Sequence, residues 1–261
     1  MSDVRGRFVW HELMTSDPQA AIPFYTDVIG WSTQSMPMGP DQTYTMWTNQ
    51  GQPNGGTMPL PEKAKAMGAP PHWLPYIGTP DLKGTVARAQ EIGATVYVPP
   101  TDIPDMGEFA VLADPQGATF AVYTSANPAQ QGESSVGIGE FSWHELLTTD
   151  WEKALAFYSD LFGWVKVDLM DMGPMGAYLI YGLNGVPMGG IMNKPAEVPV
   201  AAWLSYAHVA DLDGALAKAQ AHGAKVVNGP MKVPGGDRFV QLLDPQGAAV
   251  ALHATAAKAE T

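Results

Sequence analysis

The chain has 261 residues, a formal net charge of −12, and 46% hydrophobic against 15% charged residues. This composition can bury substantial cores and excludes a disordered protein, while the acidic balance disfavours nucleic acid and anionic membranes as partners. The absence of cysteine excludes disulfides, thiolate metal ligands and cysteine nucleophiles.

The N-terminal residues 1–7 are polar and no apolar run follows them. No stretch of the chain approaches the roughly 20 apolar residues that a membrane-spanning helix needs. We therefore expect neither a signal peptide nor a membrane span, and a cytoplasmic protein.

The first predicted elements are a strand and a helix. Strand-like residues 8–13 precede Asp17, which can cap a helix that has Pro18 at its first position. Gly30 is placed to end this helix, and short β-prone runs follow, such as residues 44–48. Within the helix, apolar residues recur at helical spacing at Ala21, Phe24, Tyr25, Val28 and Ile29.

A second strand and helix follow the same plan. Strand-like residues 73–77 lead to the capping residue Asp81, and Gly93 supplies the helix stop. The apolar stripe of this helix is Leu82, Val86, Ala89 and Ile92. The β-prone runs after it cover residues 95–98, 109–112 and 119–123. Each unit is therefore predicted to be βαβββ.

The second half of the chain repeats the first. Residues 10–31 and 143–164 are identical at 12 of 22 positions without a gap. The same order continues in a Gly-Gly pair at 55–56 and 189–190, and in an Asp-Pro-Gln-Gly-Ala motif that begins at Asp114 and at Asp244. We predict two tandem domains, residues 6–124 and 140–255, joined by a polar linker of small residues at 125–139.

This pattern resembles the vicinal oxygen chelate superfamily, which includes glyoxalases, bleomycin-resistance proteins and extradiol dioxygenases. The resemblance rests on Asp17…Phe24-Tyr25…Gly30-Trp31, on its copy from Asp150 to Trp164, and on the two Asp-Pro-Gln-Gly motifs. It implies an α+β fold in which four βαβββ units form two glyoxalase-like domains with curved mixed sheets. Because this fold carries several chemistries, it does not by itself determine the function.

The resemblance also says where metal ligands would lie. In metal-dependent members, the first-strand ligand precedes the capping Asp by seven positions, and a last-strand Glu follows the Gly of the DPxG motif by four. In this chain the corresponding residues are Trp10, Leu74, Ala121, Trp143, Leu204 and Ala251. None of these side chains can bind a hard or borderline divalent ion, so we expect no metal at these positions and no obligatory cofactor.

Alternation along the first strand of each repeat places Glu12 and Glu145 on the cavity face. A carboxylate on an apolar sheet is costly unless it is paired or does chemistry. His11 and His144 should face the opposite side, toward the helices, which indicates a structural role. Neighbouring cavity positions carry Tyr76 and Tyr123 in the first repeat, and Tyr206, His208 and His253 in the second.

These residues allow several interpretations. Glu12, Glu145, Tyr206 and His253 are the candidate catalytic residues of a metal-free acid/base site. Alternatively, Glu145, His208 and His253 form a displaced metal site, or the two glutamates only accept hydrogen bonds from tyrosines. The candidate ligand-binding residues are Trp10, Tyr76, Tyr123, Trp143, Trp47, Tyr178 and His208, and many methionines in the middle strands also suit an apolar ligand.

We therefore predict a protein that binds or transforms a small, apolar or aromatic metabolite without an obligatory metal. One alternative is a metal-dependent isomerase, lyase or oxygenase that uses the displaced site, and another is sequestration of a drug or metabolite without turnover. If the protein is an enzyme, the family suggests a lyase, an isomerase or a hydroxylase-like oxidoreductase. The duplication predicts a monomer that forms a pseudo-dimer by itself, or a weak homodimer.

Overall fold

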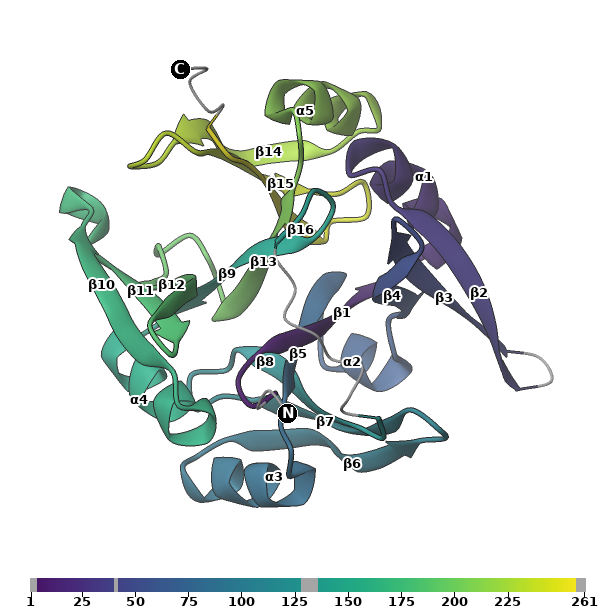
Figure 1. The fold of residues 1–261 in the computed structure, drawn as a ribbon, viewed down its shortest axis with the longest axis vertical. Coiled ribbons are helices and arrows are strands. Elements are labelled where there is room, and N and C mark those ends of the chain that lie inside the picture. The colour runs from purple at the N-terminus through teal and green to yellow at the C-terminus, as the bar shows by residue number, and fades with distance from the viewer. Residues whose placement is uncertain (1–3, 40–41, 128–135, 257–261) are drawn as a thin grey trace. The chain divides into compact units, whose positions relative to one another are not determined.

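The computed structural model describes residues 4–39, 42–127 and 136–256. Each repeat forms one eight-stranded mixed sheet, and neither sheet closes on itself (Figure 1). The predicted α+β class and the four βαβββ units, two in each repeat, are confirmed.

The first repeat builds a sheet in the order β2-β3-β4-β1-β5-β8-β7-β6. Its strands are β1 (Phe8–Thr15), β2 (Ser32–Gly39), β3 (Gln42–Asn49), β4 (Gln52–Pro59), β5 (His72–Gly78), β6 (Thr95–Ile103), β7 (Gly107–Ala113) and β8 (Thr119–Ser125). Its helices are α1 (Pro18–Val28), the short α2 (Glu62–Ala66) and α3 (Leu82–Glu91).

The second repeat builds the equivalent sheet in the order β10-β11-β12-β9-β13-β16-β15-β14. Its strands are β9 (Phe141–Thr148), β10 (Val165–Asp171), β11 (Ala177–Leu183), β12 (Val186–Asn193), β13 (Ala202–His208), β14 (Lys225–Lys232), β15 (Arg238–Leu243) and β16 (Ala249–Ala254). Its helices are α4 (Trp151–Phe162), the single 3-10 turn η2 (Gly173–Met175) and α5 (Leu212–Ala221).

The helix signals in the sequence act as predicted. The Asp17 carboxylate accepts hydrogen bonds from the backbone amides of Gln19 and Ala20 at 3.0 and 3.1 Å, and Gly30 follows α1 with φ +90°. Asp81 caps α3 through the Gly84 amide at 2.9 Å. Caps of this kind satisfy backbone donors that the first helical turn leaves without partners, so they set where each helix begins.

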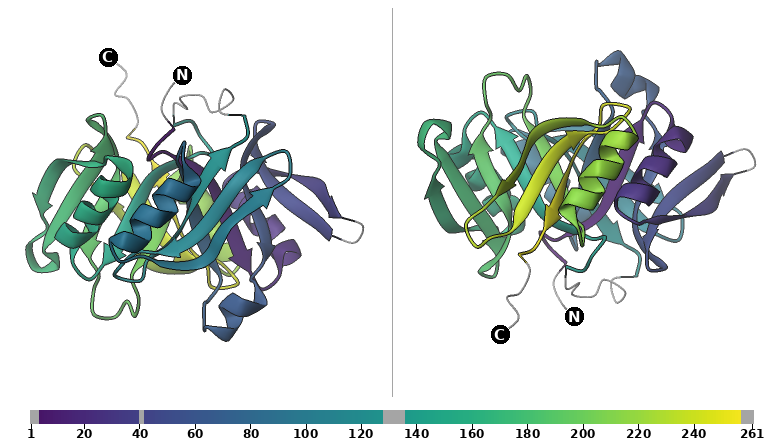
Figure 2. Two further views of the ribbon diagram at one scale, coloured as in Figure 1. Left: turned by 90° about the horizontal axis from the view of Figure 1, so that it is seen from below. Right: turned by 90° about the horizontal axis from the view of Figure 1, so that it is seen from above.

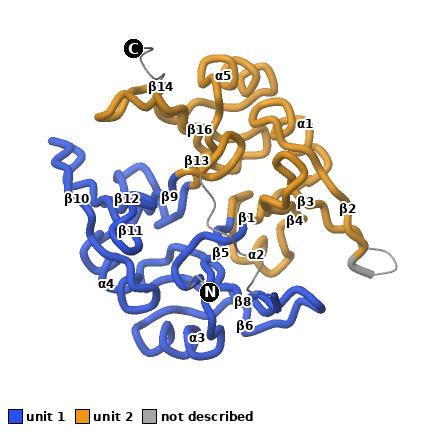
Figure 3. Tube along the Cα trace, viewed as in Figure 1, with its two compact units in different colours: residues 1–10, 74–134, 143–204 blue, residues 11–73, 135–142, 205–261 orange. Residues whose placement is uncertain are grey.

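The compact units of the molecule do not follow the repeats (Figure 3). Unit 1 comprises residues 1–10, 74–134 and 143–204, and unit 2 comprises residues 11–73, 135–142 and 205–261. Each unit therefore takes one βαβββ half from each repeat. Helices α3 and α4 pack together in unit 1, and α1 and α5 pack together in unit 2. Figure 2 shows α3 lying on one face of β6 to β8, and α5 lying on β15 and β16.

The motifs that carried the resemblance join the two repeats within each unit. In unit 2, the Tyr25 hydroxyl donates to the Asp244 carboxylate at 2.8 Å and accepts from the Trp73 indole at 2.9 Å. Unit 1 repeats this buried network with Tyr158 as its central residue, in contact with Asp114 at 3.1 Å and with Trp203 at 3.2 Å. Burial raises the pKa of both tyrosines well above the usual range. Each network thus links a helix of one repeat to the turn before the last strand of the other repeat.

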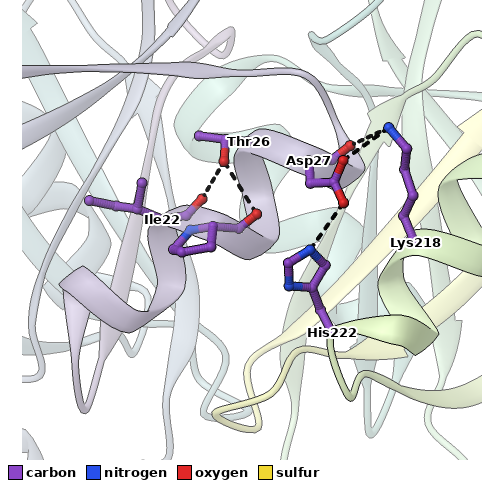
Figure 4. Close-up of polar contacts among 6 residues, drawn as sticks. Ile22, Thr26, Asp27, Lys218 and His222 are labelled. Atoms are coloured by element: carbon purple, nitrogen blue, oxygen red, sulfur yellow. Dashed lines mark hydrogen bonds and ion pairs between the residues drawn. The ribbon is translucent and has the colours of Figure 1, made fainter.

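Further contacts between repeats surround each network. The Gln116 side chain donates to the Asp150 carbonyl at 2.8 Å in unit 1, and Gln246 donates to the Asp17 carbonyl at 2.7 Å in unit 2. On the surface of unit 2, Asp27 of α1 contacts Lys218 and His222 at 3.1 and 3.0 Å (Figure 4). Hydrogen bonds from Lys218 and His222 lower the pKa of Asp27.

Most of the expected linker, residues 128–135, lies outside the described residues. The part that follows pairs with β13 in unit 2: the Gly139 amide donates to the His208 carbonyl at 2.7 Å, and the His208 amide donates to the Glu140 carbonyl at 2.8 Å. The domain boundaries at 6–124 and 140–255 stay a prediction.

Candidate functional site

A tyrosine–glutamate pair occurs in each repeat. In unit 2, the Tyr44 hydroxyl of β3 donates to the Glu12 carboxylate of β1 at 2.5 Å. In unit 1, the Tyr178 hydroxyl of β11 donates to the Glu145 carboxylate of β9 at 3.0 Å. Both carboxylates are almost fully buried, with 3% of Glu12 and 6% of Glu145 exposed. The sequence singled out both glutamates, and their tyrosine partners come from strands two places away in the sheet.

The Gly-Gly pairs explain how each tyrosine reaches across the intervening strand. Gly56 of β4 lies opposite Glu12, and Gly190 of β12 lies opposite Glu145. A Cβ atom on Gly56 would lie 1.7 Å from the Tyr44 hydroxyl, and one on Gly190 would lie 2.1 Å from the Tyr178 hydroxyl. The tyrosine ring therefore occupies the space that a side chain would fill. The absence of a side chain at these glycines therefore makes room for each tyrosine to reach its glutamate.

The pair in unit 1 has a defined direction. The Trp143 indole donates to the Tyr178 hydroxyl at 2.9 Å, and an indole N–H can only donate. Tyr178 therefore directs its own proton toward Glu145, so the carboxylate is the final acceptor in this series of two hydrogen bonds. Burial, followed by the charge of Glu145, raises the pKa of Tyr178 well above the usual range. The tyrosine therefore stays protonated near pH 7 and donates its hydrogen bond to Glu145.

His11 and His144 do not belong to these pairs. The His144 ring stacks on Phe8 in unit 1 with centroids 3.6 Å apart, and the His11 ring packs on Phe141 in unit 2 at 3.9 Å. Burial lowers the pKa of His144 to about 3, so this imidazole is neutral near pH 7. Each histidine thus packs against the first strand of the other repeat, in agreement with a structural role.

Tyr76, Tyr123 and Trp10, three further candidates of the first repeat, lie in unit 1. Tyr76 is buried and its ring contacts Phe109 with centroids 6.1 Å apart. The Tyr123 hydroxyl donates to the Met106 carbonyl at 2.6 Å. Trp10 also belongs to this unit and is partly buried.

In the second repeat, Tyr206, His208 and His253 lie together in unit 2, whereas Glu145 belongs to unit 1. The Tyr206 hydroxyl accepts a hydrogen bond from the Gln241 amide at 2.7 Å. The rings of His208 and His253 have centroids 5.3 Å apart, as their shared predicted face suggested. A cavity that unites Glu145 with these residues stays a prediction.

His253 has two polar neighbours that the sequence did not reveal. Its Nδ1 lies 3.0 Å from the Ser142 hydroxyl, and its Nε2 lies 3.3 Å from the Asp237 carboxylate. Ser142 is the second residue of β9, and Asp237 lies in the turn before β15. No sequence motif includes either residue. The available signal was that the first repeat has Val9 and Gly107, which carry no polar side chain, at the equivalent positions.

Trp47 differs in environment from the other aromatic candidates. It is completely buried in the core of unit 2, where it packs against Tyr25 and Trp31 and donates to the Gly56 carbonyl at 2.9 Å. It supports the core beneath the Gly-Gly pair, and we leave it out of the proposed ligand-binding set. Among the described residues, four methionines are exposed at the surface: Met67, Met106, Met175 and Met231.

The residues at the family's metal positions do not fit a metal. Ala121 and Ala251 lie in register with Tyr76 and Tyr206, and alanine offers no donor atom. Within residues 4–39, 42–127 and 136–256, no group of three or more His, Asp or Glu side chains is placed to hold a metal ion. No step of the chemistry below therefore passes through a metal.

The helices of the described segments include none that is long and apolar enough to cross a membrane. Among known families, residues 140–252 match the Glyoxalase/Bleomycin resistance protein/Dioxygenase superfamily, and residues 10–123 match the Glyoxalase-like domain.

Similar proteins cover nearly the whole chain. "Putative glyoxylase CFP32" of Mycobacterium tuberculosis is 33% identical over 240 residues, which is 92% of this chain and 91% of that protein. The "Anthracycline biosynthesis protein DnrV" of Streptomyces peucetius is 28% identical over 255 residues, with coverage of 93% and 91%.

Solved structures share the fold at low sequence identity. The Mn(II)-bound glyoxalase from Novosphingobium aromaticivorans superposes with a TM-score of 0.62 at 17% identity, covering 97% of this chain and 82% of that chain. For 2,2',3-trihydroxybiphenyl 1,2-dioxygenase from Sphingomonas wittichii the TM-score is 0.63 at 15% identity, with coverage of 97% and 91%. The chain therefore belongs to the glyoxalase/bleomycin resistance protein/dioxygenase superfamily, the vicinal oxygen chelate superfamily, with two glyoxalase-like domains in tandem.

Proposed function

We propose that this protein binds a small apolar or aromatic metabolite that carries an acidic O–H, N–H or C–H group, and that Glu12 and Glu145 accept the proton of that group. The main observation behind this proposal is the tyrosine–glutamate pair, which occurs in both repeats. In each pair the tyrosine side chain crosses a glycine of the strand between the two residues. No metal is required by this proposal.

The energetics support a working role for the two carboxylates. Burying an ionised carboxylate costs several kcal/mol unless hydrogen bonds and charges offset that cost. Glu145 is held by the neutral hydroxyl of Tyr178, whose own orientation is set by Trp143. A buried carboxylate that accepts from a hydroxyl of fixed orientation is a candidate general base for a bound proton donor.

The relatives support an aromatic ligand. Two of the similar proteins, from Streptomyces, are named for anthracycline biosynthesis, and anthracyclines are fused-ring aromatic compounds. Both are matched along more than nine-tenths of their length. In this chain, the partly buried Trp143 and Tyr178 in unit 1 and Tyr44 in unit 2 are aromatic side chains on which such rings could stack.

The test is a binding and turnover screen on tag-free protein with polycyclic phenols and quinones. Tryptophan fluorescence measures binding, and mass spectrometry of the recovered compound measures conversion. Glu12→Gln and Glu145→Gln remove the proton acceptors without changing side-chain size, and Glu152→Gln, on the exposed face of α4, is the matched control.

We expect binding in all variants and loss of conversion in Glu12→Gln, Glu145→Gln or both, but not in the control. Binding with an unaltered compound in every variant would favour sequestration instead. Conversion that requires a stoichiometric metal, lost on chelation and restored by one divalent ion, would overturn the proposal in favour of a metal-dependent enzyme.

A further inference from the structure

Unit 2 contains a chain of three polar side chains that the proposed function does not use. Ser142 lies at the start of β9, His253 on β16 and Asp237 in the turn before β15. The Ser142 hydroxyl is 3.0 Å from Nδ1 of His253, and Nε2 of that ring is 3.3 Å from the Asp237 carboxylate. The other oxygen of Asp237 accepts a hydrogen bond from the Ala256 amide at 2.8 Å, which fixes the carboxylate.

The proton positions follow from the charges. The Ala256 amide and His253 lower the pKa of Asp237, so its carboxylate is ionised and needs a donor from Nε2. Burial lowers the pKa of His253, so the ring is neutral near pH 7 and has only one N–H. With that proton on Nε2, the lone pair of Nδ1 faces the Ser142 hydroxyl. The serine can then donate to Nδ1, with the Tyr206 carbonyl at 3.2 Å as a competing acceptor.

The first repeat acts as an internal control for what the fold needs. The positions equivalent to Ser142, Asp237 and His253 are Val9, Gly107 and Tyr123. The equivalent strands β1, β7 and β8 form the same sheet with these residues. The polar chain is therefore not a requirement of the fold.

We infer that Ser142, His253 and Asp237 form a second reactive site, in which Ser142 is an acyl-accepting nucleophile for small carboxylic esters. The arrangement has the roles of a nucleophile, a base and an orienting carboxylate, with the two ring nitrogens exchanged relative to the common serine triad. His253 and Asp237 are accessible from solvent, with 20% and 37% of their side chains exposed.

The proposed reaction has two balanced steps. Ser142 Oγ attacks the ester carbonyl carbon while its proton moves to His253 Nδ1, and this proton then leaves with the departing alcohol. Water next attacks the acyl-serine, gives its proton to the same nitrogen and releases the carboxylic acid, and the proton returns to Ser142. Asp237 stabilises the imidazolium that forms in each step.

His208 lies beside this site. Its Nδ1 lies 3.2 Å from the Gly137 carbonyl, and its ring is 5.3 Å from that of His253. The residue is buried, with 8% of its surface exposed, and Nε2 has no hydrogen-bond partner among the described residues. After the larger effect of burial, a positive charge on His208 would oppose one on His253 and so lower its pKa.

The test treats the full-length protein with a fluorophosphonate probe and separately with p-nitrophenyl acetate. The expected result is one probe adduct per chain on Ser142, and ester hydrolysis that falls about 100-fold or more in Ser142→Val and Asp237→Asn. Ser142→Val copies the first repeat, so it should fold, and the far-ultraviolet circular dichroism of each variant checks this. Ser32→Ala, at an exposed serine of β2, is the matched control.

An unlabelled Ser142 in the wild-type protein would overturn the inference without any variant. So would labelling only at other residues, or ester hydrolysis that persists in folded Ser142→Val. These results are independent of the tyrosine–glutamate proposal, because conversion of aromatic compounds is measured with different substrates and different variants.

Discussion

Replacing the buried His144 by Gln should change how the stability of the protein depends on pH. Burial lowers the pKa of this imidazole from 6.5 to about 3, and its ring stacks on Phe8. Unfolding releases the ring into water, where it binds a proton below pH 6.5. Because the native state binds fewer protons than the unfolded state, the free energy of unfolding falls as the pH drops below 6.5.

The size of the effect follows from the shift. Each pH unit below 6.5 costs up to about 1.4 kcal/mol until the pH reaches the native pKa, so acidification from pH 6.5 to 5 should cost about 2 kcal/mol through His144 alone. His144→Gln lacks the titrating group. The variant should be less stable than the wild type at pH 8, because the stacked ring is lost, but the difference should narrow at acidic pH.

Urea denaturation followed by circular dichroism at several pH values between 8 and 5 measures both curves. Other titrating groups contribute equally to both proteins and cancel in the difference. His222→Gln, which removes a partly exposed imidazole, is the control. A wild-type-minus-variant difference that stays constant across this range would refute the claim that His144 is held neutral by burial.

Three further results are expected. Tyr158→Phe leaves two buried polar partners without their hydroxyl and should lower the free energy of unfolding by about 2 kcal/mol in urea titrations; an unchanged midpoint would contradict the network. Gly190→Ala places a methyl group where the Tyr178 ring lies, so it should weaken ligand binding at least tenfold in fluorescence titrations. The same glycine-to-alanine substitution at a turn glycine is the control and should leave binding unchanged. Fragments carrying residues 4–127 and 136–256 should each fail to give a stable monomer by size-exclusion chromatography, yet form a 1:1 complex when co-expressed, and a fragment that folds alone would disprove the shared cores.

Local signals in the sequence predicted local structure well. Asp17 and Asp81 cap the helices they were expected to cap, because capping depends on a side chain and amides two or three residues away. The apolar stripes likewise identified the buried faces of α1 and α3. Periodicity reports which face is buried but not which element covers it. It therefore could not reveal that each core is assembled from both repeats.

The candidate site shows the same division. Alternation put Glu12 and Glu145 on the predicted cavity face, and the structure shows that both are buried. It also put His208 and His253 on a common face, where their ring centroids lie 5.3 Å apart. It could not identify Asp237 as a partner of His253, since this contact depends on a turn. It also could not show that Gly56 and Gly190 leave the space that Tyr44 and Tyr178 occupy.

The shared cores have a consequence for how such a protein can diversify. A substitution at Tyr25 acts on Asp244 of the other repeat, and one at Asp114 acts on Tyr158. Core positions of the two repeats are thus bound to change together, and loss of either repeat would leave two incomplete cores instead of one intact domain. Val9 and Ser142 are partly buried and belong to neither network. The two repeats can therefore differ at these positions while the shared cores are kept.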